Sequence, residues 1–156
     1  MEKDNKWTDE RVINSLRSRE KDVIYETLDY LDNVFNSYSK YDEHTFAAIM
    51  NRVISLCVSP EIYEDKELFE ELLNILEDGA GHQMSSSVNF EPLVELFEKE
   101  QFSDNMWHLA IILGFSYQPR YIDYLKSIVT VDRVLQKEVD DAILELEYVK
   151  KITEGQ

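Results

Sequence analysis

Three histidines are the residues of this 156-residue chain best suited to proton transfer or metal binding. His44, His82 and His108 are scattered along the sequence, and none has a Cys or a second His at the spacing of a metal-ligand pair. His108 lies in an apolar segment, so we expect a buried structural residue. His82 follows Gly-Ala-Gly, which favours an exposed loop. It is either an ordinary solvated histidine or a partner-binding residue, and we include it among the binding candidates. The sequence predicts no metal site and no cofactor.

Nucleophilic side chains lack the surroundings that catalysis requires. Cys57 lies in an apolar segment without a neighbouring base that would lower the pKa of its thiol. The consecutive serines 85–87 are not part of a Gly-x-Ser-x-Gly turn. Carboxylates are abundant, but an acid and base pair needs one pKa shifted by burial or by a neighbour, and the sequence marks no such pair. We therefore expect a protein that is not an enzyme.

Carboxylates do form two rows at helical spacing, because residues three or four apart share one face of a helix. The first row and its polar continuation are Glu67, Glu70, Glu71, Asn74, Asp78 and His82, and the second row is Glu91, Glu95 and Glu98. If the two helices hold equivalent positions in neighbouring helix pairs, the rows merge into one acidic wall that suits a basic partner. The plainer interpretation is a solvated surface that keeps the protein soluble. We predict that these nine residues bind a partner.

The overall charge points to the same class of partner. The chain has 32 Asp and Glu against 16 Lys and Arg, a net charge of −16 at pH 7, and residues 61–100 alone carry 12 acids and two bases. Because binding to phosphate backbones depends on Lys and Arg, direct binding to nucleic acid is not expected. The longest run without charged residues, 105–119, is too short to span a membrane, and the charged residues 1–11 do not resemble a signal peptide. We expect a cytoplasmic protein without membrane contact.

Apolar residues recur at helical spacing along nearly the whole chain, and no segment alternates as a strand would. The sequence therefore predicts one all-α domain over 1–156. Thr8, Asp42 and Ser103 are predicted N-caps, and Gly114 is predicted to end a helix in the left-handed conformation. The segment 79–89 is either a mobile loop or a poorly formed short helix. About eight helices are expected, over 8–16, 18–36, 42–58, 65–76, 90–100, 103–114, from 119 to about 129, and over about 135–149.

The last 60 residues carry a recurring pattern of apolar and small residues. Its members are Leu93, Leu96 and Phe97, then Ala110, Leu113 and Gly114, next Pro119, Ile122 and Leu125, then Val139, Ala142 and Leu146. This pattern resembles the HEAT and armadillo class of helical repeats. The resemblance implies antiparallel helix pairs, over about 8–36, 42–78, 90–115 and 118–151, stacked as a short solenoid. An irregular helical bundle is the alternative.

A small, acidic, helical protein of this kind also resembles bacterial immunity proteins of polymorphic or contact-dependent growth inhibition toxin systems. That resemblance implies an inhibitor that occludes the active site of a cognate toxin, and the acidity indicates a basic nuclease as the toxin. The alternative is a HEAT-like adaptor or regulatory module that binds another protein along a groove. In either case we expect a monomer.

Overall fold

The computed structural model describes residues 6–100 and 103–154, and all regular secondary structure in these ranges is helical. The predicted all-α class is confirmed. The α-helices are α1 (Asp9–Ser15), α2 (Lys21–Phe35), α3 (Glu43–Cys57), α4 (Pro60–Tyr63), α5 (Lys66–His82), α6 (Glu91–Lys99), α7 (Met106–Gly114), α8 (Ile122–Lys126) and α9 (Arg133–Glu154). Two 3₁₀ turns, η2 (Ser103–Asn105) and η3 (Pro119–Tyr121), precede α7 and α8. The short helix α4 was not predicted.

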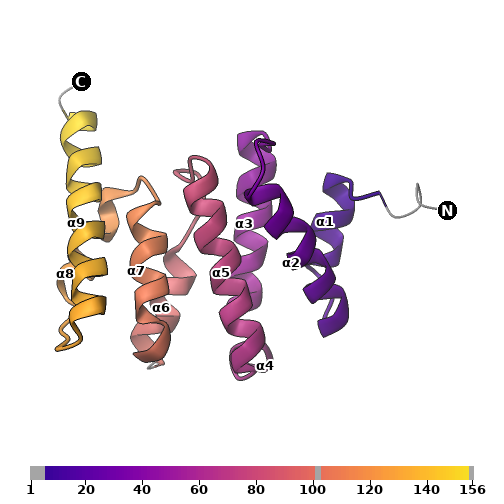
Figure 1. Cartoon of the computed structure of the whole chain (residues 1–156), viewed down its shortest axis with the longest axis horizontal. Helices are drawn as coiled ribbons and strands as arrows, with labels where there is room; N and C mark the ends of the chain where they lie inside the picture. Colours follow the sequence, from indigo (N-terminus) through magenta and orange to yellow (C-terminus); the bar gives the residue numbers. More distant parts are fainter. Residues whose placement is uncertain (1–5, 101–102, 155–156) are drawn as a thin grey trace.

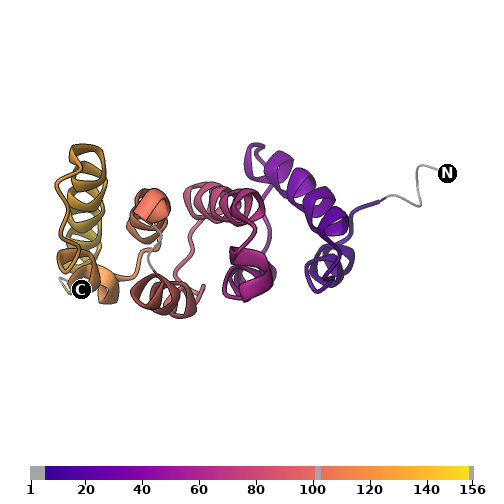
Figure 2. The same cartoon turned by 90° about the horizontal axis from the view of Figure 1, so that it is seen from below.

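The helices form two layers in a row that runs from the N-terminus to the C-terminus (Figure 1). In one layer α2 packs against α5, α5 against α7, and α7 against α9; in the other, α1 packs against α3 and α3 against α6. Contacts between α1 and α2, α3 and α5, and α8 and α9 join the layers. Seen from below, α2 and α9 extend further to one side than α5 and α7 do (Figure 2). The surface of this layer that faces away from α1, α3 and α6 is therefore concave between α2 and α9, and we call it the curved outer face.

Helix starts follow the capping residues that the sequence contains. The side chains of Thr8, Asp42 and Asp65 accept hydrogen bonds from backbone N–H groups at 3.1, 2.9 and 3.3 Å, at the first turns of α1, α3 and α5. The two N-caps predicted at residues 8 and 42 are confirmed. Ser103 instead lies in η2, and Asn105 holds the N-cap position of α7. Leucine, isoleucine and phenylalanine side chains from both layers form one continuous buried core.

The helix predicted over 65–76 is longer in the structure, because α5 continues through Gly79 and Gly81 to His82. Gly79 is buried at a tight contact, where a Cβ would lie 2.7 Å from the sulfur of Met50. Helix α5 ends where the segment between α2 and α3 contacts it. The side chain of Gln83, the C-cap residue, accepts a hydrogen bond from the Tyr41 N–H at 3.2 Å and donates one to the Tyr41 carbonyl at 3.1 Å.

The segment after α5 is neither a short helix nor detached from the core. Val88 is buried, and the Ser85 hydroxyl donates to the Phe115 carbonyl at 3.0 Å. The Gln118 side-chain amide donates to the Ser85 and Val88 carbonyls at 3.1 and 2.7 Å. These buried bonds attach the segment to the turn between α7 and η3.

Gly114 also differs from the prediction, since no glycine in the described part of the chain has a positive φ. It is the last residue of α7, and a Cβ there would lie 3.0 Å from the Cβ and 3.1 Å from the Cα of Ala142. The glycine therefore permits close contact between α7 and α9. The left-handed residue is Tyr117, with φ 59°, one residue after Ser116, whose hydroxyl donates to the Leu113 carbonyl.

Candidate functional site

The carboxylate row on α5 lies on the curved outer face. Glu67, Glu70 and Glu71 are exposed, and Asn74 and Asp78 are half-buried on the same face. The row borders α2. Burial and the nearby carboxylates of Glu67, Asp65 and Glu71 raise the pKa of Tyr25 on that helix. Five of the predicted residues are thus brought together along one helix.

The row on α6 does not join them. Glu91, Glu95 and Glu98 are exposed, but α6 belongs to the layer of α1 and α3, whereas α5 belongs to the opposite layer (Figure 2). Glu98 lies near α8, where burial and this carboxylate raise the pKa of Tyr124 to about 12. The two helices are not equivalent members of neighbouring pairs. The expected single acidic wall across α5 and α6 is therefore wrong.

Two adjoining hollows extend the α5 row in another direction. The first lies between the ends of α2 and α5 and is lined by Phe35, Asn36, Ser37, Glu77, Asp78, Gly81, His82 and Phe115. The second lies between α7 and α9 and is lined by Ile111, Gly114, Phe115, Glu138, Asp141, Ala142 and Glu145. Both share Phe115, whose side chain is 45% exposed. Together they carry five carboxylates, and neither is lined by Lys or Arg.

We call this surface the acidic face, and define it by its carboxylates and its central apolar strip. The carboxylates are Glu67, Glu70, Glu71, Glu77 and Asp78 of α5 and Glu138, Asp141 and Glu145 of α9, and the apolar strip is Trp107, Ile111 and Phe115. Trp107 is 38% exposed at the start of α7. Asp141 is paired with Lys137 at 2.8 Å, one turn earlier on α9. The acidic face combines negative charge with exposed aromatic rings, a composition suited to protein binding.

The two histidines near the acidic face have structural contacts. His82 is not in a loop but in the last turn of α5, where its Nε2 donates to the Ser39 carbonyl at 2.6 Å and its ring packs on Phe35. His108 is 2% exposed, in agreement with the buried position predicted for it, and its Nδ1 lies 3.0 Å from a carboxylate oxygen of Glu77. Both rings hold neighbouring elements against α5.

Among the carboxylates that line the first hollow, Asp78 has a strongly raised pKa. Burial, and after it the Asp32 carboxylate of α2 with which Asp78 shares a hydrogen bond, raise the pKa of Asp78 to about 6. At neutral pH the ionised pair is repulsive. A cationic group placed in this hollow would relieve that repulsion.

The titration of Asp78 predicts a pH-dependent effect of Asp78→Asn on stability. The pKa is about 6 in the folded chain and about 3.9 in an unfolded one, so this group favours folding below about pH 4 and loses that contribution as the pH rises through 6. We expect the substitution to raise the free energy of unfolding at pH 7.5 by about 1 kcal/mol, a value reduced for solvent screening. At pH 4 the free energy of unfolding should change little. Urea unfolding at both pH values measures this. Glu70→Gln is the control. An equal rise in the free energy of unfolding of that variant would assign the effect to net charge and not to the Asp32 contact.

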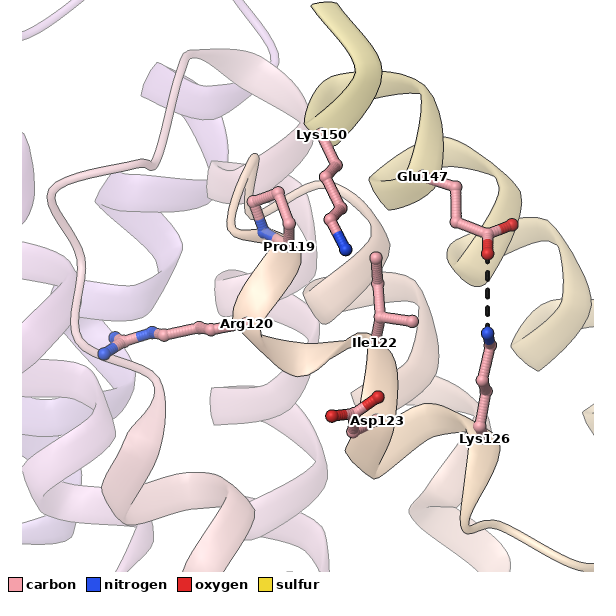
Figure 3. Close-up of a pocket in the computed structure, with 7 residues that line it drawn as sticks. All are labelled: Pro119, Arg120, Ile122, Asp123, Lys126, Glu147 and Lys150. Carbon is pink, nitrogen blue, oxygen red and sulfur yellow. Dashed lines mark ion pairs between the residues drawn. The ribbon is translucent and has the colours of Figure 1, made fainter. Parts of the chain in front are cut away.

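A third hollow, between α8 and α9, carries both signs of charge (Figure 3). Its lining residues are Pro119, Arg120, Ile122, Asp123, Lys126, Glu147 and Lys150. Lys126 pairs with Glu147 at 3.5 Å, and the Arg120 guanidinium points away from the other six residues and donates to Gln118 and to the Tyr121 hydroxyl. Because its charges are balanced or engaged, this hollow is a weaker candidate than the acidic face.

Comparison of the chain with family models, with curated protein sequences and with solved structures gives no match in any of the three. The resemblance to HEAT and armadillo repeats stays a prediction.

Within residues 6–100 and 103–154, no helix combines the length and apolar character needed to cross a bilayer. In the same part of the chain, no three His, Cys, Asp or Glu side chains are grouped to hold a metal ion. Cys57 is buried, which raises the pKa of its thiol.

Sequence reasoning missed half of the acidic face, although the signal was partly present. Glu77 follows Asn74 at a spacing of three, and Glu138, Asp141 and Glu145 repeat at three and four along the last helix, as the recognised rows do. Nothing in the sequence showed that α7 would bring these two helices to either side of Phe115.

Proposed function

We propose that this protein binds a basic protein through the acidic face. The observation that supports this most strongly is the pair of adjoining hollows, lined by five carboxylates and no Lys or Arg, that meet at the exposed ring of Phe115. Complementary charge increases the rate and the specificity of association, and a cleft that carries one sign concentrates the oppositely charged partner.

The chemistry of the acidic face favours arginine as the partner's principal side chain. A guanidinium placed over Phe115 gains a cation–π contact, and carboxylates on both sides, at Asp78 and Glu145, are available for bidentate hydrogen bonds. Arginine and aromatic residues dominate the binding energy of many interfaces. The curvature of the layer adds contact area, since α2 and α9 stand on either side of the face (Figure 2).

The more specific form of the proposal is an immunity protein that neutralises a cognate nuclease toxin. A nuclease active site must attract a phosphate backbone, so it is rich in Lys and Arg and is complementary to an acidic surface. Bound there, the acidic face would block access of nucleic acid without any chemical step. The net charge of −16 and the resemblance to immunity proteins support this form.

Co-expression with the product of the adjacent upstream gene tests the immunity proposal. If that gene encodes a basic nuclease, the toxin alone should prevent growth, and this protein should restore growth and be recovered in a complex. The complex should weaken roughly tenfold or more between low and high salt, because exposed charges are screened. Restored growth without a complex would contradict neutralisation by binding. A non-toxic upstream product that still binds the acidic face would instead support the adaptor function.

A further inference from the structure

The turn after α7 contains a residue in a costly backbone conformation. Tyr117 has a φ of 59°, and no other non-glycine residue in the described part of the chain has a positive φ. A residue with a Cβ is disfavoured in this left-handed region, whereas glycine adopts it freely. Such conformations persist where the surrounding structure enforces them, and they are concentrated at functional sites. Tyrosine at this position is therefore explained by its ring and not by its backbone.

Buried polar side chains enforce this conformation. Ser85 and Ser116 are fully buried, and Gln118 is 8% exposed. The Ser116 hydroxyl donates to the Leu113 carbonyl at 2.6 Å and accepts from the Gln118 N–H at 3.2 Å. The Gln118 side-chain amide donates to the Ser85 carbonyl, which ties the turn to the segment after α5. Because a buried polar group is costly unless it is hydrogen-bonded, this network favours a single backbone conformation at Tyr117.

The same network fixes the backbone of three apolar residues whose side chains remain exposed. Met84, Phe115 and Tyr117 are 61%, 45% and 41% exposed, and we call them the apolar edge. The hydroxyl of Ser85, which follows Met84, donates to the Phe115 carbonyl and joins the two segments. In Figure 1 these segments follow the upper ends of α5 and α7. Because their backbones are already fixed, ordering them in a complex costs little conformational entropy.

The apolar edge is continuous with the acidic face through Phe115. This ring lines both acidic hollows and lies against α5, where a Cβ added at Gly81 would be 3.7 Å from it. A partner that contacts the apolar edge therefore also meets the five carboxylates of the hollows, which neither Lys nor Arg lines. Interfaces commonly surround aromatic and methionine side chains with polar groups. The two surfaces together fit a basic protein with an apolar pocket beside its Lys and Arg side chains.

We propose that Tyr117, together with Met84, anchors the partner of the acidic face by entering an apolar pocket beside the partner's basic groups. This inference rests on the proposed function and assigns different roles to two surfaces. Attraction by the acidic face accelerates association and is screened by salt. Buried apolar contacts act mainly on dissociation and do not depend on charge. The apolar edge therefore determines how long the complex lasts.

The stability of two variants tests the explanation of Tyr117 without a partner. Tyr117→Gly removes the ring and the Cβ, so the left-handed backbone is no longer strained, whereas Tyr117→Ala removes the ring and keeps the Cβ. The urea midpoint of Tyr117→Gly should be at least as high as that of the unmodified chain, and that of Tyr117→Ala should be lower than that of Tyr117→Gly. A midpoint of Tyr117→Gly well below that of the unmodified chain would assign the ring to the fold and overturn the proposal.

Binding kinetics test the anchor itself, with the basic partner recovered by co-expression with the upstream gene. Surface plasmon resonance measures both rate constants at low and at high salt. Tyr117→Gly should raise the dissociation rate constant about tenfold at both salt concentrations and change the association rate constant by less than about twofold. Glu70→Lys with Asp78→Lys and Glu145→Lys should lower the association rate constant, and this loss should shrink at high salt. Val131→Gly, at a fully exposed position before α9, is the control and should change neither rate constant.

The two sets of variants separate this inference from the proposed function. Unchanged dissociation of Tyr117→Gly, with slower association of the charge-reversed variant, overturns the anchor and leaves the acidic face as the binding site. Unchanged kinetics of the charge-reversed variant, with faster dissociation of Tyr117→Gly, overturns the role of the acidic face and supports the anchor. No effect of either set, or the absence of a basic partner, overturns both.

Discussion

Reversing three charges of the acidic face, with Glu70→Lys, Asp78→Lys and Glu145→Lys, is expected to weaken binding to the basic partner at least 100-fold. Each substitution removes an attraction and adds a repulsion, and a factor of 100 corresponds to about 2.7 kcal/mol. The three positions lie on α5 and α9, on both sides of Phe115. Isothermal titration calorimetry against the partner recovered by co-expression measures the loss, and circular dichroism shows whether the helices persist.

The α6 row provides a matched control for this experiment. Glu91→Lys, Glu95→Lys and Glu98→Lys change the net charge by the same amount, also at exposed helix positions, but in the opposite layer. We expect the affinity of this variant to change only a few-fold, through the long-range field. If both variants lose affinity equally, the net charge of the protein matters and the acidic face is not the binding site.

Gly114→Ala and Gly81→Ala are expected to change stability in opposite directions. A Cβ at residue 114 would lie 3.1 Å from the Cα of Ala142, a backbone atom that moves only if α7 and α9 separate, and overpacking of this kind costs about 1–3 kcal/mol. A Cβ at residue 81 would meet only the Phe115 ring, at an ordinary 3.7 Å, so the gain in helix propensity remains, about 0.5–1 kcal/mol. Urea unfolding of the two variants measures both effects.

A compensating substitution separates the crowding from other causes. Ala142→Gly removes the side chain that faces Gly114, and in the Gly114→Ala background it should recover part of the lost stability even though glycine disfavours helices. Because Ala142→Gly leaves the Cα of residue 142 in place, a double variant less stable than Gly114→Ala by the full cost of a helical glycine would show that the Ala142 side chain does not limit residue 114.

The glycines illustrate how far the sequence predicts this fold. Apolar spacing identified the helical segments, apart from the single turn of α4, because burial of one helix face is encoded locally. Gly114 was assigned to a left-handed helix end and Gly79 was placed outside the helix, because glycine is common both at helix ends and at tight helix contacts, and only the neighbours distinguish the two. Those neighbours, Met50 and Ala142, lie 28 or more residues away in the chain.

The candidate site shows the same limit. The carboxylates of α5 could be predicted to share a face, since their spacing alone determines this. Whether a second row lies beside them depends on which layer each helix occupies. The carboxylates of α6 lie in the opposite layer, whereas those of α9 lie on the acidic face. His82 was expected in an exposed loop because Gly-Ala-Gly precedes it, but α5 extends through these residues, and His82 lies in its last turn in contact with Ser39.

The arrangement of the helices in a row has a consequence for how the molecule folds and opens. The principal packing partners of each helix lie within three helices of it along the chain, and such a sequential arrangement favours fast folding. Local opening in such an array begins at its ends, where a helix has neighbours on one side only. Helices α5 and α7, which carry most of the acidic face, lie in the interior of the row (Figure 1). Slow amide hydrogen exchange is therefore expected there, with faster exchange in α1, which would keep most of the acidic face assembled while the termini fray.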